Sequence, residues 1–417
     1  MCNLLINSDR LWQSIADLAQ IGGTEKGGVR RLALTDLDRQ ARDLFVKWCR
    51  EAGCTITVDT IGNIIARRAG RNDLRPPVMT GSHLDTQPTG GRFDGIYGVM
   101  AGLEVIRTLN DHNCITDAPI ELAVWTNEEG SRFSPCMMGS GVFTGVFTLE
   151  EAHATKDSRG ISVGEELRRI GYSGKIPATG HLVGAYLEAH IEQGPVLEDE
   201  SKTIGVVTGA LGLRWYDITL TGRESHAGPT PMHLRRDALV GAARLITEVN
   251  RIGHAYLPNA CATVGEVHVY PNSRNVIPGR VRLTVDLRHS EAYRLEMMED
   301  ELRKALLYLE EDLKLASSIE VVTAPAPLVF SAKCVNVIRE EAKALGLSHR
   351  DIISGAGQDA CYLARIAPTG MIFVPSEGGI SHNENEYSSP SDLAAGCNVL
   401  LRSMVRLANA DSGTRRA

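Results

Sequence analysis

The stretch Gly81-Ser-His-Leu-Asp-Thr-Gln-Pro-Thr-Gly-Gly-Arg-Phe-Asp-Gly95 decides the fold. It follows a mainly apolar run, residues 77–80, that is typical of a strand. It precedes a run in which Val99, Leu103 and Ile106 share one face of a helix. The pattern therefore predicts a strand, then a loop, then the N-terminus of a helix.

The polar residues of this stretch suit a divalent metal ion. His83 offers an imidazole and Asp94 a carboxylate, which are ligands that metals such as zinc prefer. Residues two apart on a strand face the same side, so we expect Asp85 to hold the other ring nitrogen of His83. The alternative is a polar loop that binds no ligand, and further ligands downstream decide between the two.

Composition bounds the class of protein. At 417 residues the chain is long for one domain, so its length favours two. The 43% hydrophobic and 23% charged residues are ordinary for a soluble globular protein. The net charge of −7 argues against general nucleic-acid binding, and no apolar run approaches the length of a membrane span. Nine scattered cysteines without a C-x-x-C pair suit reduced thiols, and we see no signal peptide, so we expect a cytoplasmic protein.

Two further predicted strands end in residues that can carry chemistry. Residues 120–125 form a short apolar run, typical of a buried parallel strand, and Glu128 and Glu129 follow it directly. Residues 185–190 form another strand-like run, which ends at His190. Open α/β sheets place their sites at the carboxyl ends of their strands, so we expect these side chains to meet.

The pattern changes at about residue 212. The predicted elements that follow are a strand at 213–220, a helix at 235–253, strands at 262–269 and 280–287, a helix at 290–312 and a strand at 319–322. This βαββαβ order is the ferredoxin-like split βαβ pattern. We therefore expect a discontinuous α/β domain, residues 1–212 and 329–417, with a small α+β domain inserted at 213–328. A plain two-domain chain cut near residue 212 is the alternative.

The last segment of the chain adds one more candidate ligand, His382, in a polar loop before the final helix. Three histidines and several acids at strand ends of one domain suit two metal ions that share one carboxylate. Asp94 is the best bridge, because a bridging carboxylate needs a short side chain on a rigid turn. Adjacent residues leaving a strand point to opposite sides, so one of Glu128 and Glu129 can bind metal while the other acts as a general base.

With these residues assembled, the chain resembles the M20 family of metallo-amidohydrolases and peptidases. It is more similar to the hydantoinase/carbamoylase branch, which comprises N-carbamoyl-L-amino acid hydrolases, metal-dependent β-ureidopropionases and allantoate amidohydrolases. The matching motifs run in order over nearly the whole chain, at residues 81–86, 93–95, 126–130, 188–194, 222–232, 271–279, 286–288, 354–360 and 381–382. Such a series is far more specific than any single motif.

The resemblance implies a mixed-sheet, zinc-peptidase-like catalytic domain whose inserted domain serves as lid and dimerisation domain. It implies two divalent ions per subunit, which are zinc, manganese, cobalt or nickel in different members. One ion would be held by Asp94, Glu129 and His382, and the other by Asp94, His83 and His190. The peptidase members usually have a carboxylate in place of His190, so this residue favours the carbamoylase branch.

The resemblance also implies catalytic and substrate-binding roles. Glu128 would be the general acid and base, and His226 a donor to the tetrahedral oxyanion. Arg288 would clamp the carboxylate of the substrate in a two-pronged ion pair. Further substrate-binding positions are Arg214, Asn275, Gln193 and Gly357. Family members are homodimers through the inserted domain, and His226 and Asn275 can reach the active site of the partner subunit.

These residues suit hydrolysis of a small carboxylate substrate by a metal-activated water. The expected reaction cleaves an N-carbamoyl-L-amino acid or N-carbamoyl-β-alanine to the amino acid, CO₂ and ammonia, and domain closure would complete the site. Allantoate amidohydrolase is the main alternative, because it uses the same metals and arginine clamp. A dinuclear peptidase is disfavoured by His190, and a metal-binding scaffold without catalysis is disfavoured by Glu128.

Overall fold

The structure, a computed structural model, describes residues 4–410. The chain divides into two compact units. The first unit comprises Met1–Thr208 and Phe330–Ala417, and the second comprises Gly209–Val329. Both segments of the first unit contribute to its core, so the chain leaves this unit once and returns to it.

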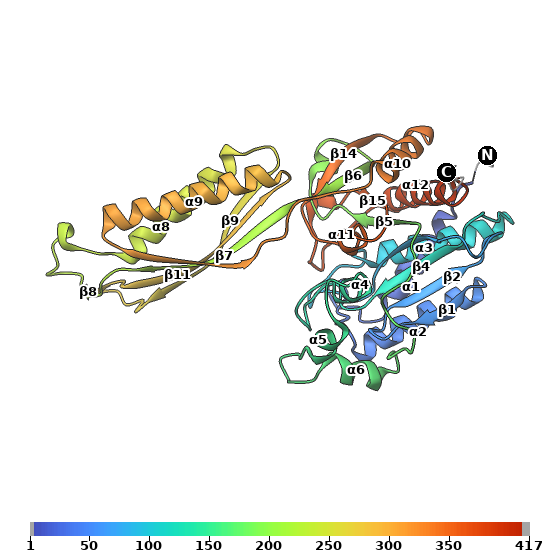
Figure 1. Ribbon diagram of the computed structural model, residues 1–417, viewed down its shortest axis with the longest axis horizontal. Coiled ribbons are helices and arrows are strands. Elements are labelled where there is room, and N and C mark those ends of the chain that lie inside the picture. The colour runs from blue at the N-terminus through green and yellow to red at the C-terminus, as the bar shows by residue number, and fades with distance from the viewer. Residues whose placement is uncertain (1–3, 411–417) are drawn as a thin grey trace, which may run out of the picture. The chain divides into compact units, whose positions relative to one another are not determined.

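The first unit is built on a nine-stranded mixed sheet (Figure 1), of which only the two-residue strand β13 lies wholly in the residue range of the second unit. Its order is β1-β2-β4-β3-β5-β15-β6-β13, and β14 also pairs with β6. The strands are β1 (Thr55–Val58), β2 (Ile64–Arg68), β3 (Val78–His83), β4 (Ile120–Trp125), β5 (Ala185–Ile191), β6 (Ile204–Ala210), β13 (Leu328–Val329), β14 (His349–Ser354) and β15 (Thr369–Val374). The four central strands β4, β3, β5 and β15 are parallel to one another. At the two ends of this group, β2 pairs antiparallel with β4 and β6 pairs antiparallel with β15. The prediction of an α/β fold with a mixed sheet is confirmed.

Helices bury the centre of this sheet. Every residue of β3, β4, β5 and β15 is buried, which explains why these strands are nearly continuous apolar runs in the sequence. Two groups of contacting helices pack on the sheet, one made by α1, α3, α10 and α12 and the other by α4 and α11. The helices are α1 (Ser8–Ala19), α2 (Asp36–Glu51), α3 (Ile96–Asp111), α4 (Met138–Phe143), α5 (Leu149–Ala154), α6 (Val163–Ile170), α7 (Val196–Asp199), α10 (Ala332–Ala344), α11 (Asp359–Leu363), α12 (Pro390–Ala408) and the 3₁₀ helix η2 (Glu377–Gly379).

The second unit pairs a four-stranded antiparallel sheet with two helices. The sheet has the order β12-β7-β11-β9, and β8 and β10 pair as a separate two-stranded ribbon. The elements are β7 (Gly212–Thr221), β8 (Ser225–His226), η1 (Met232–Leu234), α8 (Ala238–Ala255), β9 (Ala260–Tyr270), β10 (Val276–Ile277), β11 (Arg280–His289), α9 (Ala292–Leu313) and β12 (Ala316–Thr323). The sequence pattern did not predict the short ribbon, because two residues are too few to show a period.

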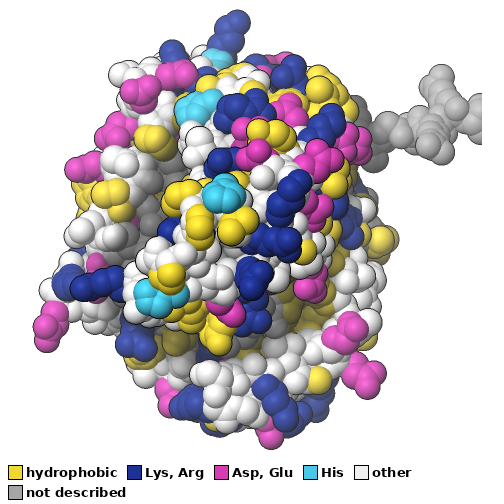
Figure 2. Space-filling view, turned by 90° about the vertical axis from the view of Figure 1, so that its left-hand side faces the viewer, with side chains coloured by type: hydrophobic (Ala, Val, Ile, Leu, Met, Phe, Trp, Pro, Cys, Tyr) yellow, Lys and Arg dark blue, Asp and Glu magenta, His cyan; other side chains and the backbone are white. Residues whose placement is uncertain are grey.

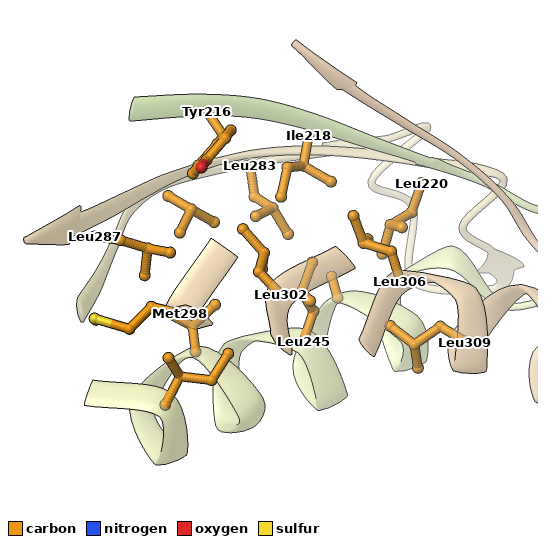
Figure 3. Close-up of a cluster of buried hydrophobic side chains, with 14 of the residues drawn as sticks. Tyr216, Ile218, Leu220, Leu245, Leu283, Leu287, Met298, Leu302, Leu306 and Leu309 are labelled. Carbon is orange, nitrogen blue, oxygen red and sulfur yellow. The ribbon is translucent and has the colours of Figure 1, made fainter. Parts of the chain in front are cut away.

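One hydrophobic core holds the second unit together (Figure 3). Alternate residues of β11 are buried, as a sheet covered on one face requires. The helices α8 and α9 supply the opposing layer, in which Leu295, Met298, Leu302, Leu306 and Leu309 of α9 recur at helical spacing. The other face of the sheet is left with polar and partly exposed side chains.

The surface seen in Figure 2 carries basic, acidic and hydrophobic side chains interspersed with one another. Exposed apolar side chains include Met232 and Leu234 of η1 and Tyr308 of α9. Within residues 4–410, none of the helices has both the length and the apolar character needed to cross a bilayer.

Candidate active site

The candidate ligands come from five segments that end at one edge of the large sheet. His83 is the last residue of β3 and His190 lies near the end of β5, which is the parallel neighbour of β3. Glu129 follows β4, the parallel neighbour on the other side, and Asp94 lies just before α3. His382 lies in the loop between η2 and α12. Because parallel strands share the direction of their carboxyl ends, the fold brings these side chains together.

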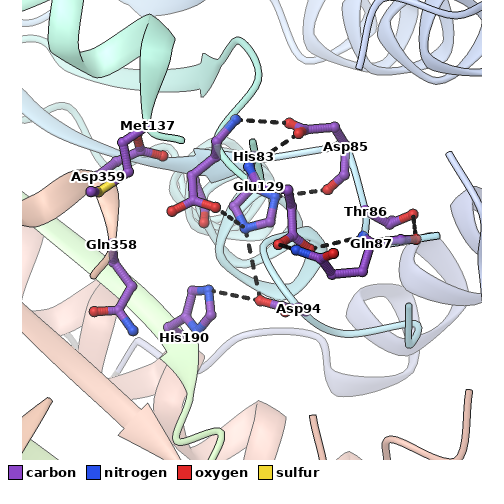
Figure 4. Close-up of polar contacts among 12 residues, drawn as sticks. His83, Asp85, Thr86, Gln87, Asp94, Glu129, Met137, His190, Gln358 and Asp359 are labelled. Carbon is purple, nitrogen blue, oxygen red and sulfur yellow. Dashed lines mark hydrogen bonds and ion pairs between the residues drawn. The ribbon is translucent and has the colours of Figure 1, made fainter. Parts of the chain in front are cut away.

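The first candidate ligand group is His83, Asp94 and His190 (Figure 4). Asp94 Oδ1 lies 3.2 Å from Nε2 of His190 and 3.8 Å from Nε2 of His83. All three side chains are buried. Two imidazole nitrogens and one carboxylate oxygen, converging at this range, are a donor set that fits a divalent metal ion.

The second candidate group shares Asp94 with the first and adds Glu129 and His382. Asp94 Oδ2 lies 3.3 Å from Nε2 of His382, which in turn lies 3.5 Å from Glu129 Oε2. The two oxygens of Asp94 therefore face different groups, as a bridging carboxylate requires. The side chain of His382 is 52% exposed, so this group opens toward solvent whereas the first is enclosed.

Backbone carbonyls orient the two buried histidines. Nδ1 of His83 donates to the backbone oxygen of Asp85 at 2.8 Å, and Nδ1 of His190 donates to that of Ile191 at 2.9 Å. A carbonyl oxygen can only accept, so in the neutral rings the proton sits on Nδ1 and the lone pair of Nε2 faces Asp94. Asp85 therefore holds the other ring nitrogen of His83, as expected, and it does so with its backbone oxygen and not with its side chain.

The carboxylate of Asp85 does not contact His83 but binds the turn after β4. Its two oxygens accept the backbone N–H groups of Glu128 and Glu129, each at 3.2 Å. Glu129 itself accepts two hydrogen bonds from Gln87, from the backbone nitrogen at 3.0 Å and from Nε2 at 2.6 Å. The loop after β3 thus fixes the turn after β4, although sequence reasoning assigned no role to Gln87.

Glu128 lies beside the first ligand group, with Oε2 3.6 Å from Nε2 of His83. Burial raises the pKa of its carboxyl well above the usual range, and the nearby carboxyls of Asp359 and Glu129 raise it further. A carboxyl whose pKa is raised in this way is suited to take up and release a proton near neutral pH. The pKa of the Glu129 carboxyl is also raised, to about 8, by burial and by the nearby carboxylate of Asp94.

Amide side chains line the same region. Gln193, which follows β5, donates from Nε2 to Asp94 Oδ2 at 3.0 Å. Gln358 donates to Gln193 Oε1 at 3.3 Å and accepts from Ser354 Oγ at 2.9 Å. The structure therefore brings Gln193 into contact with the ligand Asp94. Gly357 lies next to Gln358 in the loop between β14 and α11 and takes no part in these side-chain hydrogen bonds.

Asp359 is a buried acid that sequence reasoning left without a role, although its motif at residues 354–360 was recognised. Its Oδ1 accepts a hydrogen bond from Ser140 Oγ, and its Oδ2 is buried without a hydrogen-bond partner among the described residues. Burial raises the pKa of this carboxyl well above its usual range, and Glu188 raises it further. Asp359 is the first residue of α11 and follows β14 and a loop, and because the sequence pattern did not predict that strand, this position after a strand was not noticed.

The remaining candidates lie in the second unit. Pairing of β8 with β10 sets His226 opposite Val276, and the backbone oxygen of Asn275 accepts the N–H group of Ala227 at 2.9 Å. The ribbon therefore brings His226 and Asn275 together. Nδ1 of His226 accepts from the backbone N–H of Gly228 at 3.1 Å, so the proton of the neutral ring sits on Nε2 and is available for donation.

The two arginines lie on opposite faces of the second sheet. Arg288 of β11 pairs with Asp286 on the face that the helices leave uncovered, at 2.8 Å from Nη2 to Oδ2. Arg214 of β7 instead approaches Glu299 of α9 at 3.7 Å, and its Nη1 donates to the backbone oxygen of Ala324 at 3.1 Å. The structure therefore does not bring Arg214 and Arg288 together within this unit.

The sequence pattern of Peptidase family M20/M25/M40 matches residues 79–406, which include all five candidate ligands. This chain belongs to that family. Within M20, the chain is 47% identical to the N-carbamoyl-L-amino-acid amidohydrolase of Rhizobium meliloti, over 97% of this chain and 98% of that protein. It is 33% identical to the allantoate amidohydrolase of Bacillus subtilis, over 94% and 95% of the two chains.

Solved structures of M20 relatives share the whole fold. An amidase of the hydantoinase/carbamoylase family from Burkholderia multivorans is 57% identical and superimposes with a TM-score of 0.95, over 98% of this chain and 99% of that one. The resemblance to the hydantoinase/carbamoylase branch of M20 is thereby confirmed.

Proposed function

We propose that this M20 enzyme hydrolyses the carbamoyl C–N bond of N-carbamoyl-L-amino acids and yields the amino acid, CO₂ and ammonia. The observation that carries the proposal is the shared carboxylate Asp94, whose two oxygens face two separate ligand groups with Glu128 beside one of them. The amidohydrolases that are 36–47% identical to this chain support the choice of substrate class. N-carbamoyl-β-alanine belongs to the same class and is included in the proposal.

In this proposal the two groups hold two divalent ions, which are zinc, or manganese, cobalt or nickel. Such ions polarise a carbonyl group and lower the pKa of water when they are bound. Glu128 takes the proton of the attacking water and returns it to the leaving nitrogen, for which its raised pKa is suited. His226 donates from Nε2 to the oxyanion, and Asn275 binds the ureido or carboxylate end.

The second unit serves as lid and dimerisation domain in the proposal. Its order β7-α8-β9-β11-α9-β12 follows the βαββαβ pattern of a ferredoxin-like domain. Arg288 binds the carboxylate of the substrate, because a guanidinium presents two parallel N–H groups to a carboxylate. The enzyme acts as a cytoplasmic homodimer, and Gln193 and Gly357 lie at the substrate in the first unit.

Allantoate is the second candidate substrate. The similarity to the Bacillus subtilis allantoate amidohydrolase favours it, and the same ligand set and arginine would serve. The lower identity, 33% against 47%, places it behind the carbamoyl amino acids.

The test is ammonia release by metal-reconstituted enzyme, with chelator-stripped enzyme as the control. The substrates are several N-carbamoyl-L-amino acids, N-carbamoyl-β-alanine and allantoate, assayed side by side. Metal-dependent turnover of a carbamoyl compound is the expected result. Turnover of allantoate alone would make allantoate the substrate in place of the carbamoyl amino acids. Absence of turnover on every compound, with metal bound, would contradict the proposal.

A further inference from the structure

A buried glutamate outside the candidate ligand groups joins two parts of the site. Glu386 lies in the loop between η2 and α12 and is 4% exposed. Its Oε1 accepts the backbone N–H groups of Phe93 and Asp94, each at 3.0 Å. Its Oε2 accepts from Ser381 Oγ at 2.9 Å. One carboxylate thus connects the turn that carries Asp94 to the residue that precedes His382.

The chain reserves the space for this carboxylate. A Cβ atom added to Gly91 would lie 2.1 Å from Oε1 of Glu386, which no structure tolerates without movement. Any other residue at position 91 would therefore displace the Glu386 side chain. Gly91 and Glu386 form a matched pair, and the glycine gives an independent way to disturb the same contact.

The loop that carries His382 needs such support, because His382 has a φ of 53°. A residue other than glycine in the left-handed region is strained and stays there only when its surroundings hold it. The Glu386 backbone closes the turn that directly follows His382 by donating to the oxygen of Asn383 at 3.0 Å. The ring of Tyr387 adds an edge-on contact with Phe93, with centroids 5.9 Å apart.

We propose that Glu386 is a positioning residue that fixes Asp94 and His382 relative to each other and so assembles the group Asp94, Glu129 and His382 for metal binding. The inference rests on the metal site of the proposed function. Glu386 acts through backbone N–H groups and a serine hydroxyl rather than by touching the ion. Groups that orient metal ligands in this way typically contribute about 10–100-fold to metal affinity.

The test measures metal binding directly. Zn²⁺ is titrated into chelator-stripped full-length protein by isothermal titration calorimetry, and the melting temperature of each metal-free variant is recorded. Glu386→Ala and Gly91→Ala are expected to weaken the binding of at least one of two ions by about 10–100-fold. Glu386→Gln is expected to bind nearly as the wild type does, because its amide oxygen still accepts from Phe93 and Asp94.

Glu104→Ala is the matched control. Glu104 of α3 is also buried and also accepts a backbone N–H group, that of Asn7 at 3.0 Å, together with the guanidinium of Arg10. Its loss is expected to lower the melting temperature without changing zinc affinity, since it lies outside both ligand groups.

The outcomes separate this inference from the proposed function. Wild-type zinc affinity in Glu386→Ala and Gly91→Ala would overturn the inference. A loss of affinity that follows the melting temperature in every variant, Glu104→Ala included, would replace it with a general structural role. Wild-type protein that binds two ions but releases no ammonia contradicts the proposed function alone, whereas wild-type protein that binds no ion contradicts both.

Discussion

Oδ1 of Asp85 lies 3.2 Å from the backbone nitrogen of Glu128 and accepts its N–H group. Oδ2 of the same carboxylate accepts the N–H group of Glu129 at the same distance, and the backbone oxygen of Asp85 holds the ring of His83. A single buried residue therefore orients the proposed base and two proposed ligands. Because these contacts are made to the backbone, they fix the turn itself and not only one side chain.

Asp85→Ala is expected to lower kcat and metal affinity by about 10–100-fold. The change leaves two buried N–H groups without an acceptor, and each costs about 1–3 kcal/mol, so the turn after β4 relaxes. Ammonia release and metal content of the same preparation measure the effect.

Asp237→Ala supplies the control for Asp85. Asp237 also accepts two backbone N–H groups, those of Leu239 and Val240 at the start of α8. Its removal is expected to cost about 1 kcal/mol of stability and to leave kcat unchanged. Equal kinetic losses in the two variants would show that Asp85 has no special role.

Glu128→Gln is expected to keep both metal ions and to lose turnover by about 10²–10⁴-fold. The amide has nearly the same shape but cannot take a proton from water, and Glu128 belongs to neither ligand group. Single-turnover ammonia release and metal analysis measure the two properties separately.

Glu129→Gln is the comparison for the neighbouring acid. Because Glu129 belongs to the second ligand group, this variant is expected to lose metal as well as activity. If Glu128→Gln lost metal while Glu129→Gln kept it, the proposed roles of the two residues would have to be exchanged.

The positions of the candidate ligands follow from local sequence patterns. Strands β3, β4 and β5 are apolar runs that end abruptly at polar residues, so the carboxyl edge of the sheet could be recognised before its topology was known. His83, Glu129 and His190 are all found in this way. The pattern works because burial on both faces requires an apolar strand and the strand end does not.

The contacts that orient these ligands leave no such pattern. Glu386 and Phe93 are 293 positions apart in the chain, and their hydrogen bond depends on how two loops meet. Gln87, in the loop after β3, likewise contacts Glu129, in the turn after β4. A single loop residue has no period from which a partner could be inferred, so only the assembled fold shows these pairs.

Arg214 is a case in which a signal was present in the sequence. Tyr216, Ile218 and Leu220 are buried against the helices, and a strand with a period of two puts Arg214 on the same face. Arg288 has the opposite parity to buried Leu287 and lies on the uncovered face. Alternation alone could have separated the two arginines, and the substrate role of Arg214 stays a prediction.

A carboxylate outside both ligand groups, that of Glu166, predicts acid sensitivity of the fold. Hydrogen bonds from Arg169 hold the pKa of Glu166 below its usual range against the opposing effect of burial, and Arg132 adds to this effect. A carboxyl with a depressed pKa stabilises the fold above the unfolded-state pKa of about 4.5 and loses this contribution as the pH falls through its folded-state value.

Glu166→Gln is therefore expected to lower the free energy of unfolding by roughly 1.5–3 kcal/mol at pH 7, and the difference from wild type should shrink below about pH 4.5. Urea unfolding at pH 7, 5 and 3.5 measures it. Glu150→Gln, at an exposed position of α5, should stay within about 0.5 kcal/mol of wild type at each pH. A difference that grew on acidification would contradict the sign of the linkage.

Arg288→Ala is expected to raise KM for an N-carbamoyl amino acid by about 10–100-fold, because one charge-assisted pair with a carboxylate contributes about 1.5–3 kcal/mol. Arg288→Lys should recover only part of this, since an ammonium cannot make two parallel hydrogen bonds. In Arg214→Ala the lost contacts are those to Glu299 and the backbone of Ala324, so a lower melting temperature with unchanged KM is expected. Steady-state kinetics and thermal unfolding of the three variants decide the matter. A rise in KM of the same size in Arg214→Ala would mean that both arginines bind substrate, and therefore that Arg214 leaves its contacts on the helix-covered face during turnover.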